Sequence, residues 1–122
     1  MQKILVVDDE VRAVKFLKEE LERWNYEVCT ATNGQDALKL LTSEGPHLML
    51  LDIHMPGLNG VEVVRKAKRL NPALSIIMVT AVAEKEVARE ALEAGADDYV
   101  TKPIDLDYLQ TTIMVELSTR VN

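Results

Sequence analysis

Residues 48–60 read LMLLDIHMPGLNG and place a carboxylate directly behind four apolar side chains. An apolar run this short and continuous is typical of a strand that helices cover on both faces, as in a parallel sheet. Asp52 would then lie at the end of a buried strand, where an unpaired charge is costly. Taken alone, an aspartate before Pro-Gly and Asn-Gly turn signals is more simply interpreted as a helix cap or a turn residue. The rest of the chain decides whether Asp52 belongs to a functional site or is only a cap or turn residue.

The same apolar pattern recurs along the chain. ILVV at 4–7 and IIMV at 76–79 are also almost continuously apolar, and strand-like runs occupy 26–31 and 98–101. Segments with helical spacing separate these runs. Five strands alternating with five helices in 122 residues predict a single α/β domain. Its fold class is a doubly wound, five-stranded parallel sheet with right-handed crossovers.

The expected helices have recognisable ends. Asn33 and Asp105 are candidate helix starts, Gly95 is a candidate helix stop, and the last helix is expected to fill 105–119. The Lys102–Pro103 bond is predicted to be cis, because an X-Pro bond has only a small trans preference and tertiary context can choose the isomer.

Polar residues follow four of the five predicted strands directly. They are Asp8 and Asp9, Asp52, Thr80, and Lys102. Because the carboxyl ends of parallel strands meet at one edge of the sheet, these side chains are expected to converge there. Each residue alone would mean little, whereas the set predicts a functional site.

The charges of this predicted site require a cation. Three carboxylates at close quarters repel one another, so one should take up a proton unless a cation lies among them. Hard oxygen ligands on a shallow rim suit Mg²⁺ better than Ca²⁺. With part of the charge neutralised, one carboxylate can act as a nucleophile toward phosphorus. Lys102 and the Thr80 hydroxyl would then meet the phosphoryl oxygens.

Composition limits the remaining classes of function. The net charge of −6 argues against a nucleic-acid-binding surface. No apolar stretch approaches the ~20 residues of a membrane span, and no signal-peptide pattern is present. The single cysteine, Cys29, cannot form an internal disulfide. A cytoplasmic protein without direct contact to nucleic acid or membrane is expected.

Four sequence blocks, ILVVDDE, LLDIHMPGLNG, IIMVTA and GADDYVTKP, resemble in order and spacing the motifs of the receiver domain of bacterial two-component response regulators. The resemblance covers essentially the whole chain, and the combination is specific although no single block is. It implies a (βα)5 flavodoxin-like fold with strand order 2-1-3-4-5, and a single receiver domain over residues 1–122.

The resemblance also implies roles for the acidic residues. Asp52 would be the phosphoacceptor, with Lys102 as a catalytic partner. Mg²⁺, or Mn²⁺ in its place, would be held by the carboxylates of Asp9 and Asp52 and by the backbone carbonyl of His54. Asp8 would act on the metal through water.

The implied function is a signalling switch rather than an enzyme, a phosphoacceptor domain that assists its own phosphorylation and dephosphorylation. Thr80 would contribute to catalysis and would form a switch pair with Tyr99. The implied donor is the phosphohistidine of a sensor histidine kinase or phosphotransfer protein. A change on the face made by the fourth helix, fifth strand and fifth helix would regulate a downstream partner or output domain, and a phosphorylation-dependent dimer is compatible with this.

Three alternatives stay open on sequence alone. A haloacid-dehalogenase-like phosphatase also uses an aspartyl nucleophile with Mg²⁺, but it needs a second aspartate where this chain has His54. An unphosphorylated interaction module on the same fold would leave the acids without a role. A flavodoxin-type flavin carrier would need a phosphate-binding loop after the first strand and more aromatic residues than the 4% present.

Four further positions concern the lifetime of the phosphoryl group and the formation of dimers. The two positions that tune phosphoryl lifetime in this family hold His54 and Val82, and a general-base role for His54 competes with that of an exposed loop side chain. In the winged-helix branch of the family, dimers form through a charged pair on the last helix. Tyr108 and Thr112 stand at those positions, so that charged interface is not expected.

Overall fold

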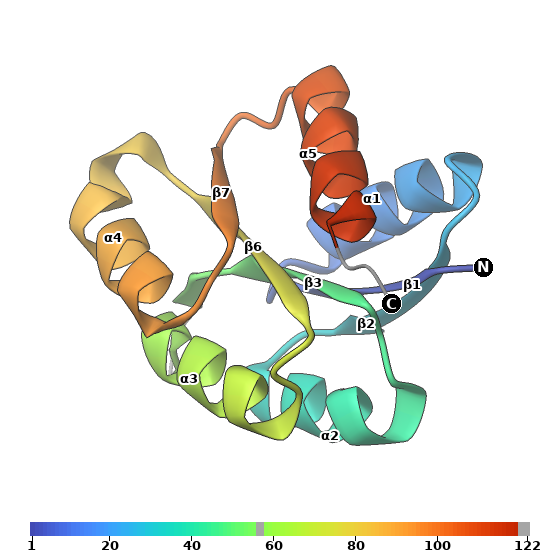
Figure 1. Cartoon of the computed structure of the whole chain (residues 1–122). Coiled ribbons are helices and arrows are strands. Elements are labelled where there is room, and N and C mark those ends of the chain that lie inside the picture. Colours follow the sequence, from blue (N-terminus) through green and yellow to red (C-terminus); the bar gives the residue numbers. More distant parts are fainter. Residues whose placement is uncertain (56–57, 120–122) are drawn as a thin grey trace.

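The computed structural model describes residues 1–55 and 58–119 (Figure 1). Five parallel strands form one sheet in the order β2-β1-β3-β6-β7, which is the predicted order when the strands of this sheet are counted along the chain. A separate antiparallel pair joins β4 to β5. The strands are β1 (Lys3–Val7), β2 (Glu27–Ala31), β3 (Leu48–Asp52), β4 (His54–Met55), β5 (Leu58–Asn59), β6 (Ser75–Thr80) and β7 (Asp98–Thr101).

Helices cover both faces of the large sheet, so the predicted doubly wound architecture is confirmed (Figure 1). Helices α1 and α5 lie on one face, and α2, α3 and α4 lie on the other. Their bounds are α1 (Val11–Arg23), α2 (Gly34–Glu44), α3 (Gly60–Leu70), α4 (Lys85–Ala94) and α5 (Leu106–Ser118). Within the described ranges, no helix has both the length and the apolar character needed to cross a membrane.

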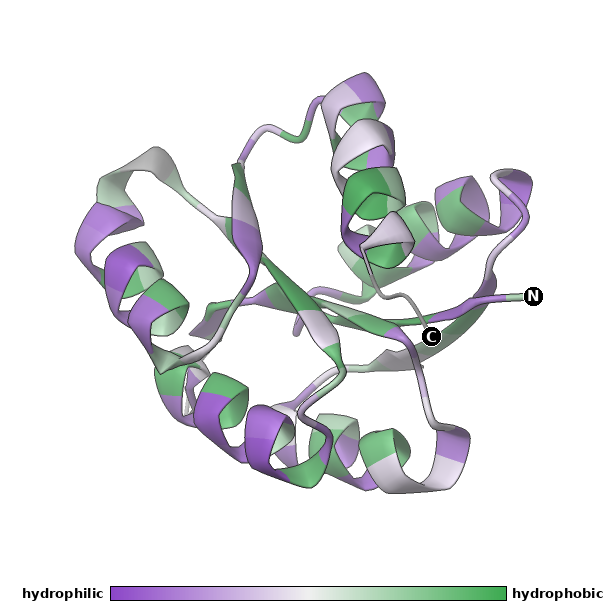
Figure 2. Ribbon diagram, in the orientation of Figure 1, coloured by the Kyte–Doolittle hydropathy of each residue, from purple (hydrophilic) through white to green (hydrophobic). Residues whose placement is uncertain are grey.

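The central strands are almost continuously apolar because helices cover both faces of the sheet. In β3, Leu48 and Leu50 pack with the α1 and α5 side, while Met49 and Leu51 pack with the side of α2, α3 and α4. Every residue of β3 and of β6 is buried. Figure 2 shows the apolar strands between helices whose hydrophilic residues face outward. Alternate side chains of one strand thus enter two different cores, which leaves no solvent-facing position for a polar residue.

The predicted helix ends are confirmed by their hydrogen bonds and backbone geometry. The Asn33 side chain accepts a hydrogen bond from the backbone N–H of Asp36, and Asp105 accepts one from the N–H of Asp107. Gly95 ends α4 with a φ of 125°, a conformation that L side chains rarely adopt. The Lys102–Pro103 bond is cis, as predicted.

Two short elements were not predicted from the sequence, the β4–β5 pair and a 3-10 turn, η1, at Val82–Glu84. The Pro-Gly signal at 56–57 lies outside the described residues. The Asn59 side chain begins α3 by accepting from the N–H of Val61 at 3.0 Å. A Cβ on Gly60 would lie 2.9 Å from backbone atoms of Ile53, so glycine is required there. This close approach holds the start of α3 against the residue that follows Asp52.

Candidate functional site

The carboxyl ends of four parallel strands bring the predicted residues together. Asp52 and Thr80 are the last residues of β3 and β6, Asp8 follows β1, and Lys102 follows β7. Carboxylate oxygens of Asp8, Asp9 and Asp52 lie within 4.8 Å of one another. The predicted convergence of the acidic side chains at one sheet edge is therefore observed.

Asp52 is the most constrained carboxylate of the site. It is 5% exposed, and each of its oxygens accepts one hydrogen bond. The backbone N–H of His54 donates to Oδ1 at 3.0 Å, and the Lys102 ammonium donates to Oδ2 at 3.0 Å. The cost of burying an acid at the end of β3 is thus offset by a backbone donor and an opposite charge.

Asp8 is equally buried, but no cation of residues 1–55 or 58–119 forms an ion pair with it. Burial raises the pKa of its carboxyl from 3.8 to about 6, and the negative charges of Asp52 and Asp9 act in the same direction. A hydrogen bond of 2.9 Å from the backbone N–H of Glu10, and the charge of Lys102, oppose this rise. The site is therefore short of positive charge.

The donor set of the acidic cluster fits a hard divalent cation. Asp9 is exposed beside the buried Asp8 and Asp52, so the three carboxylates open toward solvent on one side. Mg²⁺ prefers a few carboxylate ligands and keeps several waters, which suits a rim of this kind. A bound cation would favour the ionised form of Asp8 and so oppose the rise in its pKa that burial causes.

Lys102 contacts two neighbouring strands, β6 through its backbone and β3 through its side chain. Its backbone N–H donates to the Thr80 carbonyl at 2.8 Å, which continues the β6–β7 pairing by one residue. Partial burial lowers the pKa of its ammonium, but the hydrogen bond to Asp52 and the charges of Asp52 and Asp8 outweigh this effect, so the pKa is raised overall. Lys102 therefore stays charged beside Asp52.

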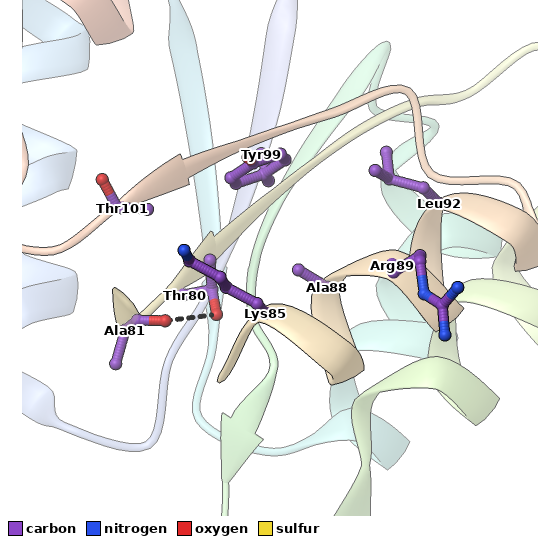
Figure 3. Close-up of a pocket in the computed structure, with 8 residues that line it drawn as sticks. All are labelled: Thr80, Ala81, Lys85, Ala88, Arg89, Leu92, Tyr99 and Thr101. Atoms are coloured by element: carbon purple, nitrogen blue, oxygen red, sulfur yellow. Dashed lines mark hydrogen bonds between the residues drawn. The ribbon is translucent and has the colours of Figure 1, made fainter. Parts of the chain in front are cut away.

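Thr80 and Tyr99, the predicted switch pair, both line a pocket of about 290 Å³, from the neighbouring strands β6 and β7 (Figure 3). The buried Thr80 hydroxyl donates to the carbonyl of Ala81 at 3.2 Å. The Tyr99 ring is 42% exposed on β7. The other lining residues are Ala81 after β6, Thr101 of β7, and Lys85, Ala88, Arg89 and Leu92 of α4. Thr80 and Tyr99 therefore line one pocket with room for a ring to move into it.

Sequence reasoning missed several groups around the site. The backbone N–H groups of Glu10 and His54 and the Ala81 carbonyl all bind site residues. Almost every residue type carries such backbone groups, so only their position next to Asp8, Asp52 and Thr80 could have indicated them.

The two positions expected to tune phosphoryl lifetime are only partly described. The imidazole of His54 is exposed, as expected, and its Nδ1 lies 3.6 Å from a carboxylate oxygen of Glu84 in η1. The side chain of Val82 lies outside what the structure describes.

Comparisons with known proteins agree with this geometry. The family model "Response regulator receiver domain" matches residues 4–114. Transcriptional regulatory protein ZraR of Salmonella typhimurium is 43% identical over 110 residues, which cover 90% of this chain but 25% of ZraR. Sporulation initiation phosphotransferase F of Bacillus subtilis is 33% identical over 121 residues, which cover 99% of this chain and 98% of that protein.

A solved structure gives the same result in three dimensions. The CheY-like receiver domain protein from Methanospirillum hungatei superposes with a TM-score of 0.93 at 35% identity, covering 98% of this chain and 96% of that one. Neither the phosphatase nor the flavin-carrier alternative agrees with these matches. The chain belongs to the response regulator receiver domain family, whose members are phosphorylation-activated signalling switches.

Proposed function

We propose that this chain accepts a phosphoryl group on Asp52, in the presence of Mg²⁺, and changes conformation in response. One observation carries the proposal. Asp52 is a buried carboxylate held between a backbone N–H and the Lys102 ammonium, and it shares its edge of the sheet with Asp8 and Asp9. An acceptor of this kind is fixed in orientation before the donor arrives, which lowers the cost of positioning it.

The proposed donor is a phosphohistidine on a sensor histidine kinase or a phosphotransfer protein. One Asp52 carboxylate oxygen forms a bond to phosphorus as the phosphorus–nitrogen bond of the donor breaks. The electron pair of that bond stays on the imidazole, which takes a proton from solvent. Lys102 and the N–H of His54 already donate to Asp52, and both are placed to stabilise charge during the transfer.

Mg²⁺ would be held by the carboxylates of Asp9 and Asp52 and by the backbone carbonyl of His54, with Asp8 acting through water, and Mn²⁺ could replace it. When bound, the metal neutralises negative charge at the phosphoryl oxygens. The oxygens that Asp8, Asp9 and Asp52 offer within 4.8 Å of one another support this assignment. The exposure of Asp9 supports its role as a direct ligand.

The readout would travel from Thr80 to Tyr99. A phosphoryl oxygen on Asp52 attracts the Thr80 hydroxyl away from the Ala81 carbonyl, and the Tyr99 ring turns from its half-exposed position into the pocket that both residues line. The altered face consists of α4, β7 and α5. The observed pocket and the outward position of Tyr99 support this direction of change.

Residues 1–122 would act as one receiver domain that assists its own phosphorylation and dephosphorylation without processing a separate substrate. The chain spans only 25% of ZraR, so the regulated output is either a linked domain or a separate protein. We propose a cytoplasmic location, no direct contact with nucleic acid or membrane, and a dimer that would depend on phosphorylation. The exposed Tyr108 and the buried Thr112 on α5 do not offer the charged pair of the winged-helix branch.

Intact-mass spectrometry with acetyl phosphate tests the proposal. The wild-type chain should gain one acid-labile phosphoryl group only when Mg²⁺ is present, and Asp52→Asn should gain none. Undiminished labelling of Asp52→Asn would refute the assignment. No labelling of the wild type under any metal condition would favour the unphosphorylated interaction module.

A further inference from the structure

A groove between α2 and α3 lies apart from the phosphoacceptor site. Helix α3 begins beside that site at Gly60, and the groove flanks its C-terminal half. The groove has a volume of about 230 Å³ and is lined by Leu38 of α2 and by Lys66, Arg69 and Leu70 of α3. None of these residues has a part in the proposed phosphoryl transfer or in the Thr80–Tyr99 switch.

Two leucines form the apolar part of the groove. Leu70 is 56% exposed at the end of α3. Leu38 is partly buried and packs against the core cluster beneath α2 and α3. A single exposed leucine is ordinary on a protein surface, but two that share one concave site form an apolar floor that a ligand could cover.

The cations at this groove differ from their neighbours on the same helix. Arg65 pairs with Glu62 at 3.3 Å, and Lys68 lies 3.6 Å from Asp97. Lys66 and Arg69 make no ion pair or hydrogen bond through their side chains within residues 1–55 and 58–119.

The groove carries positive charge, whereas the molecule as a whole is negatively charged. A favourable interaction with the helix dipole explains basic residues in the last turn of a helix, and Arg69 is one of them. It does not explain Lys66, which precedes that turn, or the exposed leucine beside both cations. In a chain of net charge −6, this groove has an apolar floor and an unpaired basic rim.

We propose that the α2–α3 groove docks an acidic protein segment, with one leucine-like side chain on Leu38 and Leu70 and flanking carboxylates on Lys66 and Arg69. Charge complementarity selects this occupant. Arg69 offers a planar set of donors that matches a carboxylate, and Lys66 offers a second positive charge. A nucleic-acid backbone would satisfy the two cations but leave both leucines uncovered. The proposal does not depend on the chemistry at Asp52.

Fluorescence anisotropy with a labelled short peptide, one central leucine flanked by glutamates, tests the proposal on the full chain. The double variant Lys66→Glu/Arg69→Glu should bind about tenfold more weakly, because two attractive pairs become repulsive. Leu70→Ser should also weaken binding. Raising the salt concentration should weaken the wild-type complex, since charges at a rim are screened.

Helix α1 provides a matched control with the same spacing of residue types. Arg12, Lys15 and Phe16 repeat the arrangement of two cations and an apolar residue, and all three are exposed. The double variant Arg12→Glu/Lys15→Glu makes the same change in net charge on a different face. It should leave the affinity of the peptide within about twofold of the wild type, because net charge alone contributes little to a specific contact.

Other outcomes would overturn the proposal. Equal losses in the α1 and α3 variants would mean that only net charge matters. Equal binding of a peptide with serine in place of leucine would show that the apolar floor is not used. A duplex oligonucleotide that binds the groove and displaces the peptide at equal concentration would identify a nucleic-acid site. A wild-type dimer in sedimentation that Lys66→Glu/Arg69→Glu abolishes would make a second copy the occupant. Circular dichroism confirms that each variant is folded.

Discussion

The ammonium of Lys102 lies 3.0 Å from Oδ2 of Asp52, although 50 residues separate them in the chain. The contact joins the end of β3 to the residue that follows β7, with β6 between them. It is the only ion pair that Asp52 makes among the described residues. One carboxylate oxygen is therefore already oriented by a positive charge in the unphosphorylated protein.

Replacing Lys102 by methionine should slow phosphorylation of Asp52 by acetyl phosphate by about 10²-fold, the usual cost of removing one charge-stabilising donor. The rate of mass increase at saturating Mg²⁺ measures the effect. Lys15→Met, which removes an exposed lysine of α1, is the matched control and should keep the wild-type rate. Equal rates in the wild type and Lys102→Met would show that Lys102 does not assist the transfer.

Asp9→Asn should weaken Mg²⁺ binding more than Asp8→Asn does. Asp9 is proposed to bind the metal directly, whereas Asp8 is proposed to act through water, and losing a direct charged ligand costs more. Titration calorimetry with each variant gives the two affinities. Equal affinities, or a larger loss in Asp8→Asn, would contradict the assignment of direct and indirect ligands.

The metal-free protein should lose stability as the pH rises from about 4 to 6. The pKa of Asp8 is about 6 in the folded protein, against 3.8 for an ordinary aspartate, so the native state binds more protons than the unfolded state in this window. Stability from this group is complete at low pH and is lost as the pH passes the folded pKa.

The expected loss is about 2 kcal/mol of unfolding free energy. Urea unfolding at a series of pH values in a chelator measures it, and Asp8→Asn should flatten the curve over that window. Saturating Mg²⁺ should restore stability above pH 6, because a cation favours the ionised carboxyl. An unchanged pH dependence in Asp8→Asn would count against a raised Asp8 pKa.

Thr80→Ala should still be phosphorylated but should switch poorly. Loss of the Thr80 hydrogen bond should reduce the conformational shift by ~1 to 3 kcal/mol, since a modification moves an equilibrium only by its differential interaction with the two states. NMR with a beryllofluoride mimic of the phosphoryl group, following residues 84–108, compares the variant with the wild type. A full wild-type response in Thr80→Ala, or a wild-type response confined to the loops around Asp8, Asp52 and Lys102, would refute this mechanism.

The sequence was sufficient for the sheet and the acidic cluster because both follow from where strands end. Asp52 is placed by the apolar run before it, and Lys102 by a run half the chain away, and parallel pairing brings the two together. The β4–β5 pair has two residues in each strand, too few for any periodicity to show.

The remaining features depend on geometry that residue types do not encode. The backbone carbonyl of Ala81 accepts the Thr80 hydroxyl because of the direction the chain takes after β6. Any residue type at position 81 would offer the same carbonyl. Leu38 and Leu70 share a groove only because of how α2 and α3 pack against each other. Neither helix alone shows which of its leucines stays uncovered.

The Thr80 hydroxyl has a single proton to donate, and in this structure the Ala81 carbonyl accepts it. A phosphoryl oxygen and Ala81 would therefore be competitors, and Thr80 could serve only one of them at a time. The resting arrangement is not a vacant state waiting for a ligand, because it has a hydrogen bond of its own. If Asp52 is phosphorylated as we propose, the Ala81 carbonyl is the acceptor to which the Thr80 hydroxyl returns once the phosphoryl group is lost, so the resting hydrogen bond itself favours the return of the unphosphorylated arrangement.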